Sequence, residues 1–330
     1  MNISNLISRF PDLEFKTQES LAPYTYMKVG GPAEAFVTVH TQDDLFSLSS
    51  FCFKENISFL VLGGASNVVI PDEGIQKLVI RNQTDGIHFE SKNAQTYEVR
   101  ADSGVVTALL ANKTMERGLT GLEYFIGVPG TIGGAIVNNS HFSPKELIGN
   151  LVVRVDVCTV QGEKETWKSD ALQFDYDYSV FHKRADIILS ATFILEVANQ
   201  TEIQEKVKAA ALKRTSTQPI GVPSSGCMYR NPRIESSQFN ELLKIVEIPE
   251  GAYHLREDGT YQVAAGFLID QAGLKKAQAG GVEVSDKHAT YMINVGGGTA
   301  HDVETLCQKV EQTVQEKYGV RLEREVFFIK

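Results

Sequence analysis

The stretch of residues 127–139 constrains the fold of this chain more than any other part of its sequence. It reads GVPGTIGGAIVNN, with four glycines in eight positions and a proline between the first two. Glycine permits a positive φ and lets main-chain N–H groups approach a ligand closely, so such a run can form a concave, anion-binding loop. The stretch therefore indicates either a loop whose amides hold a cofactor phosphate or a tight connection between packed elements.

The spacing of these glycines excludes one common nucleotide-binding signature. It is G-x-x-G-x-x-G-G, whereas a Rossmann dinucleotide-binding unit carries G-x-G-x-x-G. Two other glycine-containing loops lie earlier in the chain, at 30–32 and 63–67, and each follows or joins runs of β-forming residues. One such loop indicates little, but three in the N-terminal half favour a large, elongated cofactor that carries phosphate.

The composition is that of an ordinary globular protein and argues against several functions. The 330 residues are 42% hydrophobic and 22% charged, which suits two or three domains. A net charge of −9 without a basic block argues against a nucleic-acid partner. No apolar run is long enough to span a membrane. The four cysteines lack metal-like spacing, so we expect free thiols, no metal site and a cytoplasmic location.

Apolar periodicity and capping signals predict the secondary structure. Helices are expected over 3–10, 43–54, 105–117, 201–214 and 264–274, and a long helix should follow Thr299. A strand is expected to end at the Gly-Gly-Pro turn at 30–32, after the β-forming run that starts at Tyr24. Further strands are expected over 35–39, 59–62, 78–81, 97–101, 151–160, 187–195, 291–294 and 320–329. Residues 233–263 are expected to be irregular. Because helices and strands do not alternate regularly, the predicted fold class is α+β.

Two single residues, Cys227 and Glu325, allow both a structural and a chemical interpretation. Cys227 lies in the run GCMYRNP at 226–232. Most free cysteines are small buried residues, whereas an accessible thiol can act as an acid or a nucleophile. Glu325 precedes the apolar run at 326–328, where burial would raise the pKa of its carboxyl group, or an alternating strand would turn it to solvent. The residues alone leave both questions open.

Eight short motifs, taken in order, resemble one known family. They are KVGGPA at 28–33, LGGASNV at 62–68, GLE at 121–123, the stretch 127–139, GCMYRNP at 226–232, AGFLID at 265–270, KHA at 287–289 and LEREV at 322–326. From about Tyr24 to the C-terminus the chain resembles UDP-N-acetylenolpyruvoylglucosamine reductases, flavoenzymes of bacterial cell-wall precursor synthesis. The short link after Phe181 resembles the shorter subtype of this family, which lacks an inserted tyrosine loop.

The resemblance implies a fold, a reaction and a cellular setting. The fold would be α+β, with a vanillyl-alcohol-oxidase (PCMH-type) FAD-binding fold in two subdomains, 1–76 and 77–213. An α+β substrate-binding domain would follow at 214–325, and the last strand near 326–330 would return to the first subdomain. The protein would use FAD and NADPH to reduce the UDP-sugar UDP-N-acetylenolpyruvoylglucosamine to UDP-N-acetylmuramate for peptidoglycan. We expect a cytoplasmic monomer.

The resemblance also implies roles for individual residues. The residues expected to hold FAD are Gly63, Gly64, Ala65, Ser66, Asn67, Gly127, Pro129, Gly130, Thr131, Gly133, Gly134 and Asn139. Cys227 stands where the family usually has the serine that donates a proton, and Glu325 would assist it. A thiol, with a pKa of about 8.5, is a stronger acid than a hydroxyl, so proton donation stays possible. The residues expected to contact the substrate are Tyr176, Arg230, Asn231 and His288.

Three departures from the family pattern qualify these expectations. The run FDYDYSVF at 174–181 has Asp177 where the family has an arginine that stabilises a developing carboxylate charge. Lys183, Arg184 or Arg230 would then have to supply the cation. His141 replaces a small residue beside the expected flavin loop, and 233–263 is longer than the usual link. Asp177 keeps two alternatives open: a flavoprotein of the same fold with another substrate, or a catalytically impaired paralogue that binds flavin or a UDP-sugar.

Overall fold

The computed structural model describes residues 3–143 and 145–330, which fold into two compact units. The first unit comprises the chain up to Ser20 with Pro32–Ala65 and Ile75–Ser216, and the second comprises Leu21–Gly31, Ser66–Gly74 and Thr217–Lys330. The loop 63–67 therefore contributes to both, because Ala65 belongs to the first unit and Ser66 to the second.

The first unit contains the longer strands of the chain. Its helices are α1 (Ile3–Arg9), α2 (Gln42–Lys54), α3 (Thr107–Met115), α4 (Ile132–Asn138) and α5 (Gln200–Thr217), with 3-10 turns at 123–125, 148–151, 169–172 and 180–182. Its strands are β1 (Phe15–Ser20), β2 (Pro32–Val39), β3 (Phe59–Leu62), β5 (Ile75–Asn82), β6 (Ile87–Ser91), β7 (Thr96–Asp102), β8 (Leu119–Thr120), β9 (Val152–Cys158), β10 (Lys164–Lys168) and β11 (Ile187–Val197).

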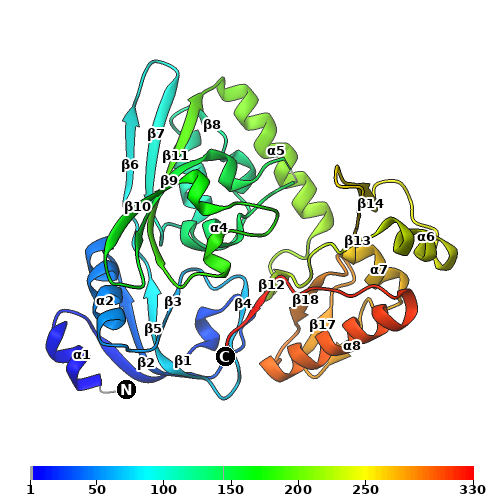
Figure 1. The fold of residues 1–330 in the computed structure, drawn as a ribbon, viewed down its shortest axis with the longest axis horizontal. Coiled ribbons are helices and arrows are strands. Elements are labelled where there is room, and N and C mark those ends of the chain that lie inside the picture. Colours follow the sequence, from blue (N-terminus) through cyan, green and yellow to red (C-terminus); the bar gives the residue numbers. More distant parts are fainter. Residues whose placement is uncertain (1–2, 144) are drawn as a thin grey trace. The chain divides into compact units, whose positions relative to one another are not determined.

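These strands form two sheets with different topologies. The smaller has the order β1-β2-β5-β3, in which β2, β5 and β3 are parallel and β1 pairs antiparallel at the edge. The larger is antiparallel, with the order β10-β9-β11-β7-β6 and β8 beside β11; the long β6–β7 hairpin lies at its edge (Figure 1). Consecutive residues of β2, from Ala35 to Val37, are buried, as expected for a strand covered on both faces.

The second unit is built from shorter elements. Its helices are α6 (Ser236–Ile245), α7 (Ala265–Gln271) and α8 (Ala300–Tyr318), with a 3-10 turn at 22–24. Its strands are β4 (Val68–Val69), β12 (Ser224–Cys227), β13 (Arg233–Ile234), β14 (Tyr253–Leu255), β15 (Tyr261–Val263), β16 (Gln278–Ala279), β17 (Val282–Val284), β18 (Tyr291–Asn294) and β19 (Phe327–Phe328).

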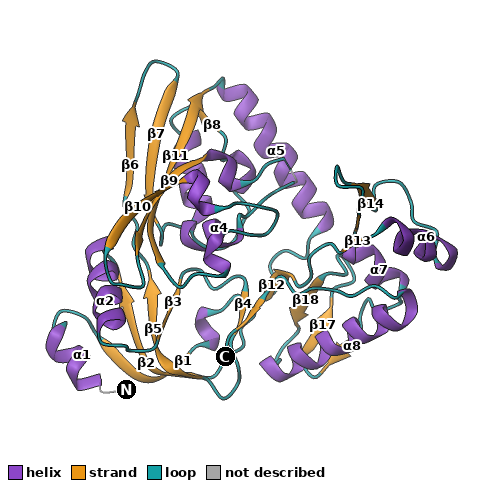
Figure 2. Ribbon diagram, in the orientation of Figure 1, coloured by secondary structure: helices purple, strands orange, loops and turns teal. Residues whose placement is uncertain are grey.

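Helix α8 and an antiparallel sheet of order β12-β18-β17-β16 form the centre of the second unit (Figure 2). The helix begins with a capping box between Thr299 and Asp302 and ends at Gly319, whose φ is +65°. Its apolar stripe is buried against β16 and β17 and consists of Val303, Leu306, Val310, Val314 and Tyr318. A three-stranded sheet, β13-β15-β14, and the parallel pair β19-β4 complete this unit.

Most predicted elements are confirmed. Strands β3 and β18 begin and end at the predicted residues, and α2, α5 and α8 differ from the prediction by a few residues at their ends. Thr41 caps α2, because its hydroxyl accepts a hydrogen bond of 3.1 Å from the Asp44 N–H group. The predicted α+β fold class is therefore confirmed. The domain boundaries at 76, 213 and 325 stay a prediction.

Three local predictions are wrong. Residues 233–263 contain α6 and three strands, because Phe239 and Leu242 supply a buried helical face that the polar residues around them concealed. Of 320–329, only Phe327–Phe328 form a strand. The β-forming residues before the Gly-Gly-Pro turn form no strand, and Tyr24 is the last residue of a 3-10 turn at 22–24 that contains Pro23.

No helix among the described residues is long and apolar enough to cross a membrane.

Candidate functional site

In the first unit, the two glycine loops predicted to hold the cofactor pack directly on each other. A Cβ atom on Gly63 would lie 2.2 Å from the Thr131 Oγ1 atom, and one on Gly64 would lie 2.6 Å from the Gly130 Cα atom. Real Cβ atoms do not approach other atoms so closely. Gly64 meets main-chain atoms and therefore requires glycine, whereas a Cβ atom at position 63 would have to displace the Thr131 hydroxyl. The residues 63–65 that follow β3 and the residues 130–131 that precede α4 thus form one continuous main-chain surface.

The main-chain N–H groups of this surface differ in whether they donate a hydrogen bond to the chain. Those of Ile132 and Gly133 donate to the carbonyl groups of Val105 and Ser103 at 2.9 and 2.8 Å. Within residues 3–143 and 145–330, the N–H groups of Gly64 and Ala65 donate no hydrogen bond to the chain. A Cβ on Gly134 would meet no atom within 4 Å. Donors without a partner beside a surface free of side chains fit a cofactor that carries phosphate.

Asn139 holds the neighbouring loops together. It ends α4 in the left-handed conformation, with φ +46°, and its side chain is buried. The side-chain NH2 group donates to the Asp175 carbonyl at 2.8 Å, and the side-chain oxygen accepts from the Gly149 N–H group at 2.9 Å. Since both ends of the carboxamide contact the chain, Asn139 joins the predicted cofactor loop to the segments at Gly149 and Asp175.

The two unusual residues of the first unit, His141 and Asp177, contact each other. The His141 Nδ1 atom lies 3.2 Å from the Asp177 Oδ1 atom, and the Asp177 carboxylate is almost fully buried. Asp177 has a φ of +51°, a conformation that aspartate tolerates better than most residues. The His141 ring also packs on Tyr176, with 4.8 Å between ring centroids. The Asp177 carboxylate is therefore directed at an imidazole.

The cations expected to compensate for Asp177 have different surroundings. Arg184 donates to the Asp186 carboxylate at 2.6 Å, and its guanidinium lies over the Trp167 ring, so it is already engaged. The Lys183 ammonium lies 5.7 Å from the centroid of the Tyr178 ring. Compensation by Lys183 therefore stays a prediction, and so does compensation by Arg230.

In the second unit, Cys227 differs from the other three cysteines in its accessibility. It is half-buried at the end of β12, whereas Cys52, Cys158 and Cys307 are buried. Burial raises the pKa of Cys52 and Cys307 to about 12 and that of Cys158 to about 11. Among the described residues, no group of three His, Cys, Asp or Glu side chains could hold a metal ion.

The thiol of Cys227 takes part in a short chain of polar side chains. The Thr290 hydroxyl oxygen lies 3.2 Å from the Cys227 Sγ atom and 2.7 Å from the His288 Nδ1 atom. Burial lowers the pKa of His288, and the charge of Lys275 lowers it further. Nothing in the sequence singled out Thr290, although it follows the KHA motif that contains His288.

Glu325 lies next to the Cys227 strand because the backbone joins the two segments. The Glu325 N–H group donates to the Met228 carbonyl at 2.8 Å, one residue beyond Cys227. The Asn67 side chain donates to the Glu325 carbonyl at 3.3 Å. Glu325 is half-buried rather than fully exposed. The structure thus brings together both predicted catalytic residues and one predicted cofactor residue, all within the second unit.

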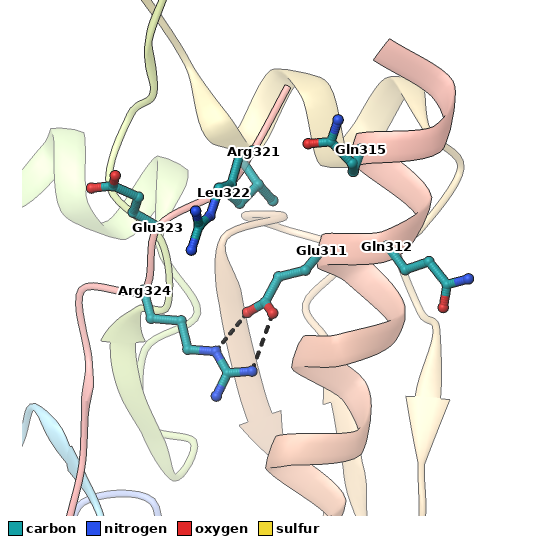
Figure 3. Close-up of a pocket in the computed structure, with 7 residues that line it drawn as sticks. All are labelled: Glu311, Gln312, Gln315, Arg321, Leu322, Glu323 and Arg324. Carbon is teal, nitrogen blue, oxygen red and sulfur yellow. Dashed lines mark hydrogen bonds and ion pairs between the residues drawn. The ribbon is translucent and has the colours of Figure 1, made fainter. Parts of the chain in front are cut away.

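Arg324, which the sequence did not single out, fixes this segment to α8. Its guanidinium donates to Glu311 at 2.6 Å and to Glu304 at 2.5 Å, and Figure 3 shows it directed at Glu311. A pocket of about 640 Å³ lies here; it is lined by Glu311, Gln312, Gln315, Arg321, Leu322, Glu323 and Arg324. None of the predicted site residues lines it. Arg324 instead supports the backbone from which Glu325 projects.

Two predicted substrate residues already have partners within the second unit. The Asn231 side-chain oxygen accepts from the Ala265 N–H group at 3.0 Å, at the start of α7. The Arg230 N–H group donates to the Glu323 carbonyl at 3.0 Å, which adds to the pairing of the Cys227 and Glu325 segments. Substrate contact by these residues stays a prediction.

Comparisons with known proteins agree on one family. A family model described as "UDP-N-acetylenolpyruvoylglucosamine reductase, C-terminal domain" matches residues 218–329, and one described as "FAD binding domain" matches 33–166. UDP-N-acetylenolpyruvoylglucosamine reductase 2 of Bacillus cereus is 35% identical over 319 residues, which cover 97% of this chain and 94% of that protein. The reductase of Streptococcus uberis is 33% identical over 327 residues, which cover 98% and 96%. The chain belongs to the UDP-N-acetylenolpyruvoylglucosamine reductase family.

A solved structure extends this likeness to three dimensions. The crystal structure of the reductase from Thermus caldophilus matches with a TM-score of 0.73 at 26% identity and covers 96% of this chain and 99% of that chain. The FAD-domain match spans both glycine loops of the first unit. The predicted membership of the reductase family and the predicted FAD-binding α+β fold are therefore confirmed.

Proposed function

We propose that this protein is an FAD-dependent oxidoreductase that uses NADPH to reduce UDP-N-acetylenolpyruvoylglucosamine to UDP-N-acetylmuramate. Family membership supports the reaction class. One observation of this chain carries the proposal: Cys227, at the position of the family's proton donor, is the half-buried thiol among four cysteines, and its strand is hydrogen-bonded to the segment of Glu325. A thiol that is accessible and held in place suits an acid that acts on a bound substrate.

The glycine loops of the first unit would hold FAD. The N–H groups of Gly64 and Ala65 would donate to its phosphates, and Gly134 would let the cofactor approach the main chain. When bound, FAD would supply the redox chemistry, accepting a hydride from NADPH and passing it to the enolpyruvyl double bond. The chain itself would orient the ligands and move the proton.

The reduction adds one hydride and one proton across a carbon–carbon double bond. The hydride reaches the β-carbon, and negative charge develops on the α-carbon and its carboxylate. The Cys227 thiol would then give its proton to the α-carbon and become a thiolate. Glu325, on the paired segment, would orient the thiol or a water molecule beside it. Tyr176, Arg230, Asn231 and His288 would contact the substrate.

The surroundings of Asp177 support the proposed substrate over a cationic or less anionic ligand. A carboxylate exposed at position 177 would suit a cationic or less anionic ligand. The Asp177 carboxylate is instead buried and paired with His141. A UDP-sugar that carries a carboxylate therefore remains the substrate we propose.

The purified protein tests the proposal directly. We expect a yellow protein. In the absence of oxygen, NADPH should bleach its absorbance near 450 nm, and NADH should do so more slowly. Adding UDP-N-acetylenolpyruvoylglucosamine should restore the colour and give one UDP-N-acetylmuramate per NADPH consumed. A colourless protein, or a flavin that this substrate fails to reoxidise, would exclude the proposed reaction.

Variants at Cys227 separate the proton step from the redox step. Cys227→Ala should leave flavin reduction by NADPH unchanged and lower substrate reduction at least about 100-fold, a typical contribution of acid catalysis. Cys227→Ser, which restores the family residue, is the matched control and should remain active. Normal turnover by the alanine variant would remove the thiol from the mechanism.

A further inference from the structure

The hydroxyl of Thr290 joins the Cys227 thiol to the imidazole of His288. Thr290 precedes β18, and Cys227 ends the antiparallel partner strand β12, so pairing of the two strands sets the separation of the side chains. The Met228 N–H group donates to the Thr290 carbonyl at 2.8 Å, which fixes Thr290 beside the thiol. Thr290 is only 3% exposed, so its hydroxyl has little access to water.

A single hydroxyl proton between two acceptors allows two hydrogen-bonding arrangements. In the first, the thiol donates to the Thr290 oxygen and Thr290 donates to the unprotonated Nδ1 atom of His288. In the second, Nδ1–H donates to Thr290 and Thr290 donates to a thiolate. The distances of 3.2 Å to sulfur and 2.7 Å to nitrogen suit both. Converting one arrangement into the other moves a net proton between the ring and the sulfur.

We propose that Thr290 and His288 form a proton relay that stabilises the Cys227 thiolate and returns a proton to it after each turnover. In the return step, one proton passes from solvent through His288 and Thr290 to the Cys227 sulfur. A solvent proton binds Nε2 of His288, the Nδ1 proton moves to Thr290, and the Thr290 proton moves to sulfur. The ring ends neutral, now protonated on Nε2, and the thiol is restored. Before the next return the ring releases the Nε2 proton to solvent and takes up a proton at Nδ1, which resets the relay. No oxidant, reductant or further reactant is consumed.

The surroundings of His288 support a ring that rests neutral. Burial lowers its pKa, and Lys275, which is ion-paired with Asp270 at 2.7 Å, lowers it further. The Tyr291 ring packs edge-on at 5.0 Å, and the charged residues Asp286 and Lys287 precede His288 in the chain. A neutral imidazole can accept a proton at one nitrogen while it donates from the other. Thr290 is a positioning residue, since it acts through the thiol.

The first test measures the thiol and needs no substrate. The rate at which iodoacetamide alkylates the flavoprotein should follow the Cys227 thiolate, because the other three thiols are buried with a raised pKa. Thr290→Val has the same shape but no hydroxyl. It should slow alkylation at pH 7 about tenfold, a shift of about one pKa unit. Thr290→Ser should restore the rate, and Cys227→Ser should abolish it.

The second test measures return of the proton and rests on the proposed function. In one anaerobic turnover the thiol starts protonated, so Thr290→Val should reoxidise flavin within about twofold of the normal rate. His288→Gln also removes a proposed substrate contact, so it is judged only by the ratio of its steady-state rate to its single-turnover rate. In steady state Thr290→Val should turn over about tenfold more slowly, with a larger solvent deuterium effect, and Thr290→Ser should recover. The ratio for His288→Gln should fall by the same factor. Thr313→Val, which removes a hydroxyl bonded to the Lys309 carbonyl on α8, is the control for loss of a threonine hydroxyl.

The two tests distinguish failure of the relay from failure of the reaction. If the substrate is not reduced at all, alkylation still reports whether Thr290 controls the thiol. If Thr290→Val alkylates and turns over like the unaltered protein, the relay is wrong. Equal losses in single and repeated turnover, without rescue by serine, would show that Thr290 is only a packing residue.

Discussion

The glycine loops of the first unit and the thiol cluster of the second are built in opposite ways. In the loops the main chain forms the surface, and a Cβ on Gly63 or Gly64 would overlap its neighbours. In the cluster the side chains of Cys227, Thr290 and His288 form the site, and the strands only set their spacing. Where main chain packs on main chain, as at Gly64, there is no room for an added atom, whereas a side-chain site can exchange one proton donor for another.

This difference predicts two kinds of variant. A change at Gly64 acts by steric overlap with main chain, so fold and cofactor should be lost together. A change in the thiol cluster acts on chemistry, so the protein should remain folded and yellow while its turnover falls. Cys227→Ser is of the second kind, because it would put an oxygen atom where sulfur lies, with a different acidity.

The largest effect should come from Gly64→Ala. Its Cβ would lie 2.6 Å from the Gly130 Cα atom, and main-chain atoms cannot move aside cheaply. We expect the free energy of unfolding to fall by about 3 kcal/mol and the purified protein to lose its FAD. The measurements are thermal unfolding and the ratio of absorbance at 450 and 280 nm. A stable, fully yellow variant would show that the two loops are not packed as described.

Gly134→Ala is the matched control for Gly64→Ala. Its Cβ would meet no atom within 4 Å, and alanine favours a helix over glycine by about 0.5–1 kcal/mol. Unfolding stability should therefore rise slightly or stay the same. FAD content should nevertheless fall, because the added methyl group would occupy space that the cofactor needs. Unchanged FAD content would place the cofactor away from Gly134.

The main-chain site was easier to predict from sequence than its supports. Glycine spacing directly reports where a side chain cannot fit, so Gly63, Gly64 and Gly130 were identified as loop residues. Asn139 was assigned to the cofactor, yet its carboxamide holds two loops of the chain. Such a pairing joins residues far apart in sequence and leaves no local pattern.

The thiol cluster shows the same limit for side chains. The GCMYRNP run pointed to Cys227, but Thr290 was missed because a threonine before a strand is usually only a strand residue. The role of Arg324 cannot be predicted from the LEREV motif, because its partners on α8 are set by tertiary packing. Likewise, His141 and Asp177 are two separate departures in the sequence, and only the structure shows that their side chains contact each other.

A smaller effect should follow from Arg324→Gln, which tests how the side-chain site is supported. The variant leaves Glu304 and Glu311 without their cation. We expect a loss of about 2 kcal/mol in unfolding free energy, because the group is partly buried. Turnover should fall as the Glu325 segment loosens, while FAD content should not change. Arg321→Gln, at an exposed arginine of the same segment, is the control and should have little effect.

The Arg324 effect should depend on pH in a defined direction. Hydrogen bonds from Arg324 lower the pKa of Glu304 below its ordinary value. A lowered carboxyl pKa stabilises the fold above the unfolded pKa, about 4.3, and this contribution disappears as pH falls through the folded value. The stability difference between the two proteins should therefore be constant near neutrality and shrink below about pH 4. A difference independent of pH would assign the loss to packing.

The smallest effect should be the coupling between His141 and Asp177. These two side chains lie in the first unit, which also contains the glycine loops. Asp177→Asn keeps a residue that tolerates the left-handed conformation and removes the charge. His141→Ala removes the partner. Each should cost about 1 kcal/mol, and the double variant should cost about 1 kcal/mol less than the sum, as expected for residues in contact. Additive losses would mean that the two departures arose independently, and that the buried carboxylate is held by other groups. A measured coupling would show that His141 and Asp177 stabilise the first unit through their contact with each other, so that the two departures act as one feature.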